Sequence, residues 1–363
     1  MNHDDCHRHK KDKPHVSRRS FLKLTAAALA SSPLTTACGG NVGQQRIRSV
    51  TDADRALRRN ADSPLAIAYC ESYEEDMFKL LKPLLKDLDL PDLTGKSVLI
   101  KPNIVDAMQG RPLTTNPAML AVAAQLVDYL GAKDIVIGEG PAHNRDTELI
   151  LERSGMRKVI TKLGVKFVDL NIDDLEKYEN PNGFSKLETL FLPKSVANAD
   201  IVVSLPKLKT HHWARLTCSM KNLYGTVPGR KYGWPKNTLH FAGIDNCTLD
   251  LVRLIKPAIQ LVDAVVAMEG DGPLYGTAKQ ANFIMLGTDP VAVDSTCARI
   301  MGIDPVNVPY LHIGGQAIGH VDPARIKIFG TEIAKVASNF KPAPTFDATG
   351  RELKHQDART ASS

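Results

Sequence analysis

The chain has 363 residues, of which 43% are hydrophobic and 24% are charged, and its formal net charge is +6. This is an ordinary globular composition, long enough for one large core or two lobes, and no apolar stretch reaches the roughly 20 residues of a transmembrane helix. Much of the positive charge lies in residues 1–37, so the remaining chain is nearly balanced and no nucleic-acid partner is expected.

The first segment is expected to be an export signal. Residues 17–23, "SRRSFLK", match the twin-arginine export motif, and a mildly apolar run rich in Ala and Leu follows. Residues 1–37 are therefore predicted to be a signal peptide that engages the twin-arginine export machinery. Because this route carries folded proteins, the mature protein is expected in the periplasm or tethered to the outer side of the cytoplasmic membrane.

Residues 34–40, "LTTACGG", resemble a lipoprotein box in which Cys38 becomes the first residue of the mature chain. Thr35 stands where leucine is usual, so ordinary cleavage after Ala37 stays open as the alternative. A lipid on Cys38 would hold the protein at a membrane surface. Residues 38–63 would then serve as a polar tether.

Strand patterns alternate with helix patterns from residue 64 to residue 330. Apolar runs predict strands at residues 65–70, 97–100, 134–138, 166–170, 188–192, 200–205, 258–266, 282–287 and 325–330. Helical periodicity predicts helices at residues 73–88, 115–131, 146–164, 243–256 and 289–301. This order indicates an α/β domain over residues 64–330, with a largely parallel or mixed sheet and helices on both faces. Residues 331–363 are polar and are expected to form a loose tail.

Two of the predicted helices have clear starts. In the helix at residues 115–131, Asn116 can cap the first turn and Pro117 fits its first position. In the helix at residues 289–301, Asp289 can act as the cap.

Four cysteines remain in the predicted domain: Cys70, Cys218, Cys247 and Cys297. None of them forms a C-x-x-C pair. An oxidising compartment would allow disulfides, but Cys70 ends an apolar strand and Cys297 lies in an apolar helix. Buried thiols are therefore the favoured interpretation.

Polar and charged residues follow several predicted strands directly. Lys101 and Asn103 follow one strand, Glu139 the next, and Lys207 and Lys209 a third. In a parallel sheet, ligands bind beyond the carboxyl ends of the strands, so these residues are expected to share a substrate site. Lys207 and Lys209 would point the same way on an extended segment, and two amines suit a phosphate or a carboxylate. Solvated lysines are the competing interpretation.

Residues 211–240 add further candidates. Lys221 and Asn222 are predicted to join the substrate site, although Asn222 could equally cap a turn. His211 is a candidate catalytic group or metal ligand, and His240, just before a predicted helix, is a candidate acid–base group. A structural role is the alternative for each histidine.

Three acidic residues form the predicted metal or acid–base set. Asp263 lies inside an apolar strand, where its carboxylate must be paired, protonated or bound to a cation. Asp294 faces the same constraint in the helix at residues 289–301, and a structural hydrogen bond is its alternative. Glu269 lies between a strand and a glycine-rich turn, which suits a catalytic group or a ligand of a divalent cation.

Five stretches in this order, "KPNIV", "SLPKLKTH", "KNLYG", "DAVVAMEGDGP" and "GTDPVAVDS", resemble the bacterial and archaeal family called domain of unknown function 362. The resemblance covers roughly residues 64–330. It implies no settled activity. Some members of the family add a ferredoxin-like module with two four-iron clusters, but this chain has no C-x-x-C-x-x-C run.

Three functions remain open from the sequence. The first is an exported enzyme in which lysines hold an anionic small molecule while carboxylates bind a divalent metal or move a proton and a histidine assists. The second is a non-catalytic lipoprotein that binds an anion or a metal. The third is a redox protein with an iron–sulfur cluster, which suits export after cofactor insertion but not the scattered cysteines.

Overall fold

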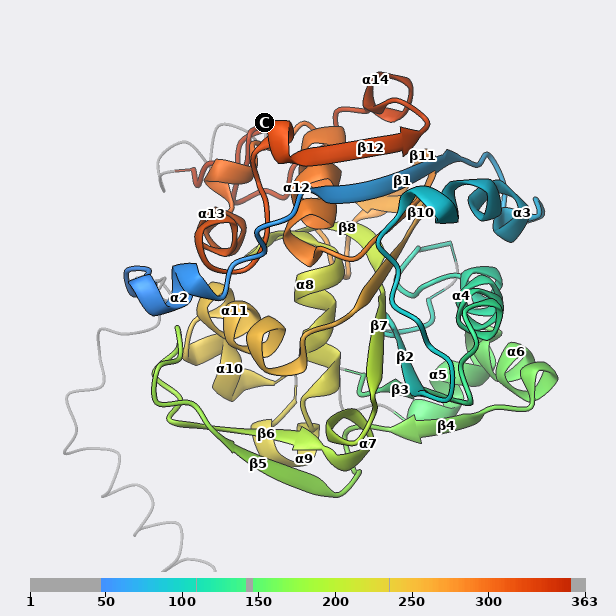
Figure 1. The fold of residues 1–363 in the computed structure, drawn as a ribbon, viewed down its shortest axis with the longest axis horizontal. Helices are drawn as coiled ribbons and strands as arrows, with labels where there is room; N and C mark the ends of the chain where they lie inside the picture. Colours follow the sequence, from blue (N-terminus) through green and yellow to red (C-terminus); the bar gives the residue numbers. More distant parts are fainter. Residues whose placement is uncertain (1–46, 109, 142–145, 235, 354–363) are drawn as a thin grey trace, which may run out of the picture. The chain divides into compact units, whose positions relative to one another are not determined.

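The computed structural model describes residues 47–108, 110–141, 146–234 and 236–353. The predicted signal peptide and Cys38 lie outside these ranges, so export and lipidation stay predictions. The described residues form one compact unit rather than two lobes. They are built around a sheet of ten strands with helices on both of its faces (Figure 1). The predicted α/β class, with a mixed and mostly parallel sheet, is confirmed.

One half of the sheet is entirely parallel. Its strands run in the order β7 (Ile201–Leu205), β2 (Ser97–Pro102), β3 (Asp134–Glu139) and β4 (Lys166–Asp169). Successive residues of one strand face opposite sides of a sheet. Leu99 accordingly packs into one hydrophobic cluster, while Val98 and Ile100 pack into the other.

The other half of the sheet is mixed. It runs through β10 (Ile259–Glu269), β11 (Thr277–Gly287), β1 (Ser63–Tyr69) and β12 (Ile326–Gly330). β10 is parallel to β7, the pairs β10–β11 and β11–β1 are antiparallel, and β1–β12 is parallel. The long strands β10 and β11 therefore join the parallel half to the edge of the sheet.

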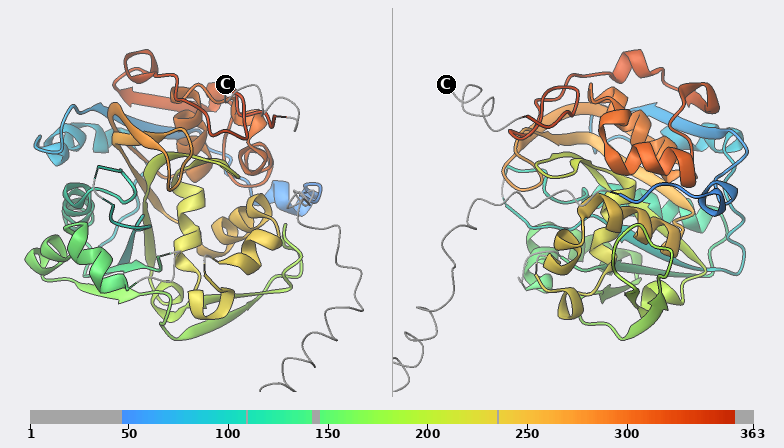
Figure 2. Two further views of the ribbon diagram at one scale, coloured as in Figure 1. Left: turned by 180° about the vertical axis from the view of Figure 1, so that it is seen from behind. Right: turned by 90° about the vertical axis from the view of Figure 1, so that its left-hand side faces the viewer.

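Helices cover each face of the sheet and bury a separate hydrophobic cluster. Figures 1 and 2 show α4, α5 and α6 on one face, and α8, α11, α12 and α13 on the other. The bounds of these and the other helices are α2 (Asp52–Ala56), α3 (Met77–Leu81), η1 (Lys82–Asp87), α4 (Pro117–Tyr129), α5 (Thr147–Arg153), α6 (Met156–Leu163), α7 (Lys194–Ala197), α8 (Ser219–Asn222), η2 (Leu223–Thr226), α9 (Gly229–Tyr232), α10 (Asn237–Phe241), α11 (Ile244–Ile255), α12 (Pro290–Ile300), η3 (Pro305–Asn307), α13 (Pro309–Ala317), η4 (Pro323–Arg325) and α14 (Ile333–Val336). The remaining strands are β5 (Leu175–Glu179), β6 (Thr189–Pro193), β8 (Lys207–His211) and β9 (Arg215–Thr217).

The predicted helix starts are confirmed. The Asn116 side chain accepts a hydrogen bond from the backbone N–H of Ala118, and the Asp289 side chain accepts one from Val291. The helix predicted at residues 146–164 is instead two helices. Gly155 separates them because its backbone is left-handed, at φ +76°, a conformation that favours glycine.

Both predicted polar ends of the domain are more ordered than the sequence indicated. Before β1, Asp54 is buried and its carboxylate pairs with Arg48 and Arg253. After β12, Phe340 and Phe346 are buried against the domain, so residues 331–353 are not a loose tail. The sequence pattern misses these segments because isolated apolar residues among polar ones lack helical or strand periodicity.

The four cysteines of the domain are buried and form no disulfide within the described ranges, as the sequence favoured. Among the helices of the described residues, none combines the length and the apolar character that crossing a bilayer requires.

Candidate functional site

The carboxyl ends of β2 and β7 lie side by side where the chain order reverses. β2 leads through α4 to β3 on one side, whereas β7 continues toward β10 on the other. Ligands of open α/β sheets bind at such a switch point. After Pro206 the chain forms the new strand β8, which pairs with β10 and turns back into β9. The sequence predicted a strand exit at this segment, and the structure shows a hairpin.

Five buried lysines gather around this point, and we call them the buried lysine cluster: Lys101, Lys207, Lys209, Lys221 and Lys236. Two of them form ion pairs with buried carboxylates, Lys101 with Glu139 and Lys207 with Asp263. Within the described residues, no carboxylate lies within ion-pair distance of the other three. Buried charges are usually paired, so this excess of amines distinguishes the region.

The first pair joins three of the predicted substrate-site residues. Lys101 Nζ lies 2.7 Å from Glu139 Oε2 and donates to Asn222 Oδ1, also at 2.7 Å. Glu139 also accepts hydrogen bonds from the backbone N–H groups of Ile104 and Gly140. Because the carboxylate and the amide are both engaged by the protein, this trio fixes the ends of β2 and β3 rather than offering free groups to a ligand.

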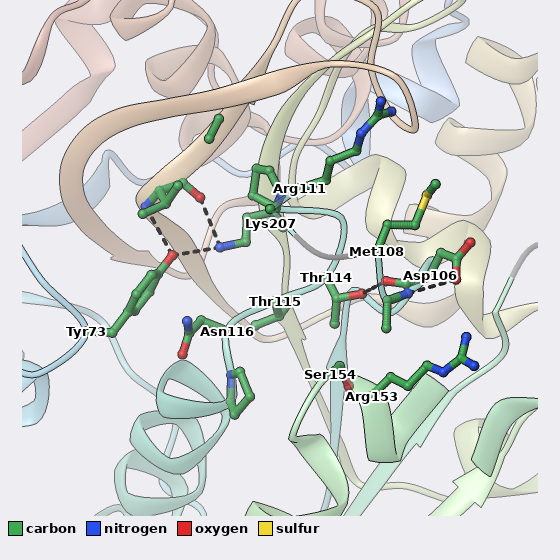
Figure 3. A pocket seen from close by; sticks show the side chains of 16 residues that line it. Tyr73, Asp106, Met108, Arg111, Thr114, Thr115, Asn116, Arg153, Ser154 and Lys207 are labelled. Atoms are coloured by element: carbon green, nitrogen blue, oxygen red, sulfur yellow. Dashed lines mark hydrogen bonds between the residues drawn. The ribbon is translucent and has the colours of Figure 1, made fainter. Parts of the chain in front are cut away.

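The second pair is also engaged internally. Lys207 Nζ lies 2.6 Å from Asp263 Oδ2, and it donates to the Tyr73 hydroxyl at 2.7 Å and to the Val266 carbonyl at 3.0 Å. Tyr73 in turn donates to Asp263 Oδ1, and the backbone N–H of Asn116 donates to Oδ2. An ammonium group has three donors, so Lys207 has none left for a ligand. Figure 3 shows Lys207 between Tyr73 and the β10 backbone.

Lys209 and Lys221 have donors to spare. Lys209 is fully buried, and its ammonium donates to the Leu113 carbonyl at 2.7 Å. Lys221 Nζ lies 3.6 Å from the centre of the Tyr224 ring, and no hydrogen-bond acceptor for it is found among the described residues. Burial, aided by the charge of Lys101, lowers the pKa of Lys221 to about 7. Burial also lowers the pKa of Lys209 well below its ordinary value.

Lys236 is the fifth member of the cluster. It donates to Asn171 Oδ1 and to the Val227 carbonyl, and burial lowers its pKa to about 7. These two acceptors hold its amine within the protein, which leaves Lys209 and Lys221 as the amines best able to bind a ligand.

The two predicted catalytic histidines lie next to this pair of lysines. His211 Nδ1 accepts hydrogen bonds from the backbone N–H groups of Trp213 and Ala214, which assigns its proton to Nε2. His240 Nδ1 lies 3.1 Å from the Lys236 carbonyl, which leaves Nε2 as an acceptor. Burial lowers the pKa of His240 to about 3 and that of His211 well below its usual value, so both are neutral at physiological pH.

Aromatic contacts link these groups into one cluster. The His240 ring centre lies 5.5 Å from that of Tyr224, over which Lys221 sits, and 5.4 Å from that of Trp213. Trp213 also contacts His211, at 6.5 Å. One neutral imidazole therefore presents a donor and the other an acceptor near the same amine.

The predicted metal set is not assembled. Asp263 is paired with Lys207, and Asp294 accepts hydrogen bonds from the backbone of Ser219 and Met220 at the start of α8. Glu269 lies six positions beyond Asp263 on β10, roughly 20 Å along the strand, and accepts from the Lys341 backbone. Among the described residues, no three His, Cys, Asp or Glu side chains are placed to hold a metal ion. The four buried thiols likewise form no such cluster.

Asn103, the last predicted substrate-site residue, is buried at the start of the loop after β2. Its backbone N–H donates to Thr115 Oγ1, and its side-chain Oδ1 has no hydrogen-bond partner among the residues that the structure describes. It therefore lies at the switch point, as the sequence predicted, but its position alone does not assign it a ligand.

A basic cleft of about 730 Å³ lies on the outer side of the loop that follows β2. Its lining includes Arg111, Arg153, Asn116, Ser154 and the stem of Lys207 (Figure 3). The sequence did not indicate Arg111 or Arg153, because one lies in a loop and the other ends a helix, where an arginine is common. Leu113, whose carbonyl accepts from Lys209, lies between two residues that line this cleft, so a single loop separates the cleft from the cluster.

Comparisons with known proteins place the chain in a family. Residues 98–299, which include all five buried lysines, match the family described as a domain of unknown function (DUF362). The chain belongs to this family. It confirms the resemblance seen in the sequence.

Two similar proteins illustrate how far the likeness extends. A thylakoid-associated protein, sll1697, of Synechocystis is 29% identical to this DUF362 protein over 221 residues, or 59% of the chain and 66% of the relative. The chain thus spans slightly less than two thirds of that relative. The lactate racemase apoprotein of Thermoanaerobacterium thermosaccharolyticum is 13% identical, with a TM-score of 0.43, covering 70% of this chain and 59% of that one.

Lys207→Ala should destabilise the protein, because it leaves the buried Asp263 carboxylate without its counter-ion. We expect the free energy of unfolding to fall by about 3–5 kcal/mol, measured by urea denaturation. The double variant Lys207→Met with Asp263→Leu removes both charges and should recover most of the loss. Wild-type stability of the single variant would show that the pair does not support the fold.

Gly225→Ala should also destabilise the protein. A Cβ atom at this position would overlap Glu139 Oε1 and Lys101 Nζ, which are buried and held by hydrogen bonds. We expect a loss of about 1–3 kcal/mol in the free energy of unfolding. Gly314→Ala in α13 is the control, because its Cβ would approach no atom closer than 3.2 Å. Equal melting temperatures for the two variants would contradict the packing argument.

Proposed function

We propose that this DUF362 protein is an enzyme that binds a small anionic molecule through Lys209 and Lys221. The observation that carries the proposal is the presence of two buried amines with unused donors and no carboxylate in ion-pair distance among the described residues. A buried amine without a counter-charge either loses its proton or takes up an anion. A phosphate or carboxylate group would satisfy both lysines at once.

The neighbouring histidines supply the acid–base chemistry in this proposal. His211 Nε2–H donates a hydrogen bond to the bound molecule, and His240 Nε2 accepts a proton from it. Both side chains are neutral in the free protein, and an anion bound beside them would raise the pKa of each imidazole by favouring its protonated form. The reaction class that fits is a proton transfer on an anionic substrate.

The ion pairs of the cluster support the same site indirectly. Lys101 with Glu139 and Lys207 with Asp263 hold the ends of β2, β3 and β8 in fixed positions. Because these strand ends are fixed, the polar groups around the site need to move less when charge develops on a substrate. Arg111 and Arg153 of the basic cleft add a positive field that attracts anions to this edge of the sheet.

We infer the place of action from the sequence of the N-terminal segment. Residues 17–23 support export through the twin-arginine route, and Cys38 supports a lipid tether. The relative from Synechocystis is named as thylakoid-associated, which accords with a position at a membrane surface.

A non-catalytic anion-binding lipoprotein is the second candidate. It would use the same two lysines, and the internal engagement of Lys101, Lys207 and Glu139 is compatible with it. The complementary hydrogen-bonding states of His211 and His240 favour the enzyme, because general acid–base catalysis requires both a donor and an acceptor beside the bound molecule.

Lys221→Met should weaken anion binding without lowering stability. Sulfate binding measured by calorimetry should fall at least about tenfold, the value of one lost charge-assisted hydrogen bond. The melting temperature of the free protein should stay constant or rise, because a buried amine without a partner has been removed. Lys194→Ala, on the surface, is the control for a general charge effect. Unchanged sulfate affinity in Lys221→Met would remove this lysine from the site.

Sulfate affinity should depend on pH through Lys221. Its pKa is about 7 in the free protein, and a bound anion favours the ammonium form and so raises that pKa. Binding therefore takes up a proton above pH of about 7, and affinity should be constant just below that value and fall up to about tenfold per pH unit above it. Lys209, whose pKa is also lowered, would steepen the fall.

Calorimetry in buffers of different ionisation enthalpy measures this proton uptake directly, and sulfate itself does not titrate in the range. Lys221→Arg keeps its charge throughout and should show a flatter dependence. A wild-type affinity that does not change between about pH 7 and pH 9 would contradict the assignment.

A further inference from the structure

Four buried polar atoms beside the proposed anion site have no hydrogen-bond partner in the described chain. They are Arg215 Nη1, Thr217 Oγ1, Asp245 Oδ1 and Asn246 Oδ1. Their side chains are 6%, 5%, 6% and 2% exposed. Buried polar atoms in folded proteins are almost always satisfied, so a group of four calls for a partner that fits between them.

Two of these residues share a face with the proposed anion ligands. In the β8–β9 hairpin, Thr217 is paired with Lys209 and Arg215 with His211. Residues directly opposite each other on antiparallel strands project from the same face of the sheet. The hydroxyl of Thr217 therefore projects from the same face as the amine of Lys209.

The other two residues lie at the start of α11, across from the hairpin. The Tyr224 hydroxyl, on the ring over which Lys221 sits, donates to the carbonyl of Ile244 at 2.8 Å, and Asp245 is the next residue. Burial raises the pKa of Asp245 to about 6, while the charges of Arg215 and Lys221 lower it. Asn246 follows it in the same turn of the helix. The start of α11 therefore lies beside Lys221, in the same part of the molecule as the hairpin.

Arg215 is held so that one arm of its guanidinium stays free. Its Nε donates to the Gly350 carbonyl at 2.9 Å, and its guanidinium stacks 4.5 Å from the centre of the Phe346 ring. Its backbone has a φ of +70°, a left-handed conformation unfavourable for a side chain with a Cβ. Such conformations persist where the surroundings enforce them, and they concentrate at functional sites.

The unpartnered groups include both hydrogen-bond donors and acceptors, and this combination indicates which kind of ligand would bond to all of them. Arg215, Lys209 and Lys221 require acceptors, as an anionic group provides. Asp245 and Asn246 present oxygens and so require donors. Thr217 can either donate or accept. A plain anion such as sulfate would leave the two acceptors unsatisfied, whereas an anion that also carries a hydroxyl or an ammonium group would satisfy both kinds.

We propose that Arg215, Thr217, Asp245 and Asn246 form a subsite that binds the hydroxyl or ammonium group of the anionic ligand. This inference rests on the proposed function, because the anionic group itself is held by Lys209 and Lys221. The subsite narrows the ligand class to small phosphates or carboxylates with a hydrogen-bond donor a few bonds from the charged group.

A matched pair of phosphate esters tests the subsite. Glycerol 3-phosphate and n-propyl phosphate have the same charged group and carbon number, but only the first has hydroxyl groups. Calorimetry on the wild-type protein should show at least about tenfold tighter binding of glycerol 3-phosphate. The variant Thr217→Val should reduce that preference severalfold while leaving the affinity for n-propyl phosphate within about twofold. Asp245→Asn should also reduce the preference, although its lost negative charge should tighten the binding of both esters.

Stability measurements distinguish a subsite from a structural role. Thr217→Val removes a hydroxyl that bonds to no other group in the described part of the chain, so its melting temperature should equal or exceed that of the wild type. Thr226→Val is the control, because that buried hydroxyl donates to the Leu223 carbonyl at 2.6 Å. The control should lose stability and keep the preference for glycerol 3-phosphate.

Each outcome has a separate meaning. Equal affinity of the wild type for the two esters would overturn the subsite and leave the proposed function standing. No binding of either ester would overturn the proposed function and the subsite together. A fall in the melting temperature of Thr217→Val, with the preference unchanged, would show that the hydroxyl serves the fold alone.

Discussion

The cost of burying positive charge is the constraint on which this structure depends. Five lysine amines lie beneath the surface at the carboxyl ends of the central strands. Two are neutralised by Glu139 and Asp263, and these pairs join strands that are distant in the chain. The structure therefore uses the same residue type in two ways. Paired lysines shape the switch point, and the unpaired ones carry the proposed affinity for anions.

The hydrogen-bond networks of the paired lysines fix the strands that surround the unpaired lysines. The Lys101 network ties β2 to β3 and, through Asn222, to the end of α8. The Lys207 network ties β8 to β10 and, through Tyr73, to the segment after β1. Lys209 lies on β8 between these networks, and Lys221 precedes Asn222. The surroundings of both unpaired amines are thus fixed, which in the proposed function keeps these amines available for a ligand.

The sequence indicated the fold and the grouping of charged residues at the candidate site because both follow from short-range patterns. Apolar strands alternating with helices predicted the sheet, and Lys101, Glu139 and Lys207 were predicted from their places at strand ends. Which lysine is paired was not predictable, because the partners of Lys101 and Lys207 lie 38 and 56 positions away along the chain. The predicted metal set failed to assemble for a related reason. Residues six apart on one strand, such as Asp263 and Glu269, lie far from each other.

The contacts of Arg215 with Phe346 and Gly350 have a consequence for biosynthesis. Gly350 lies 135 positions after Arg215, beyond the last strand of the sheet. On the ribosome, the strands and the lysines emerge well before the residues that fix the guanidinium. A nascent chain therefore lacks the contacts that position Arg215 in the proposed subsite until its last residues have been made. For a protein expected to cross a membrane already folded, competence to bind would be acquired last.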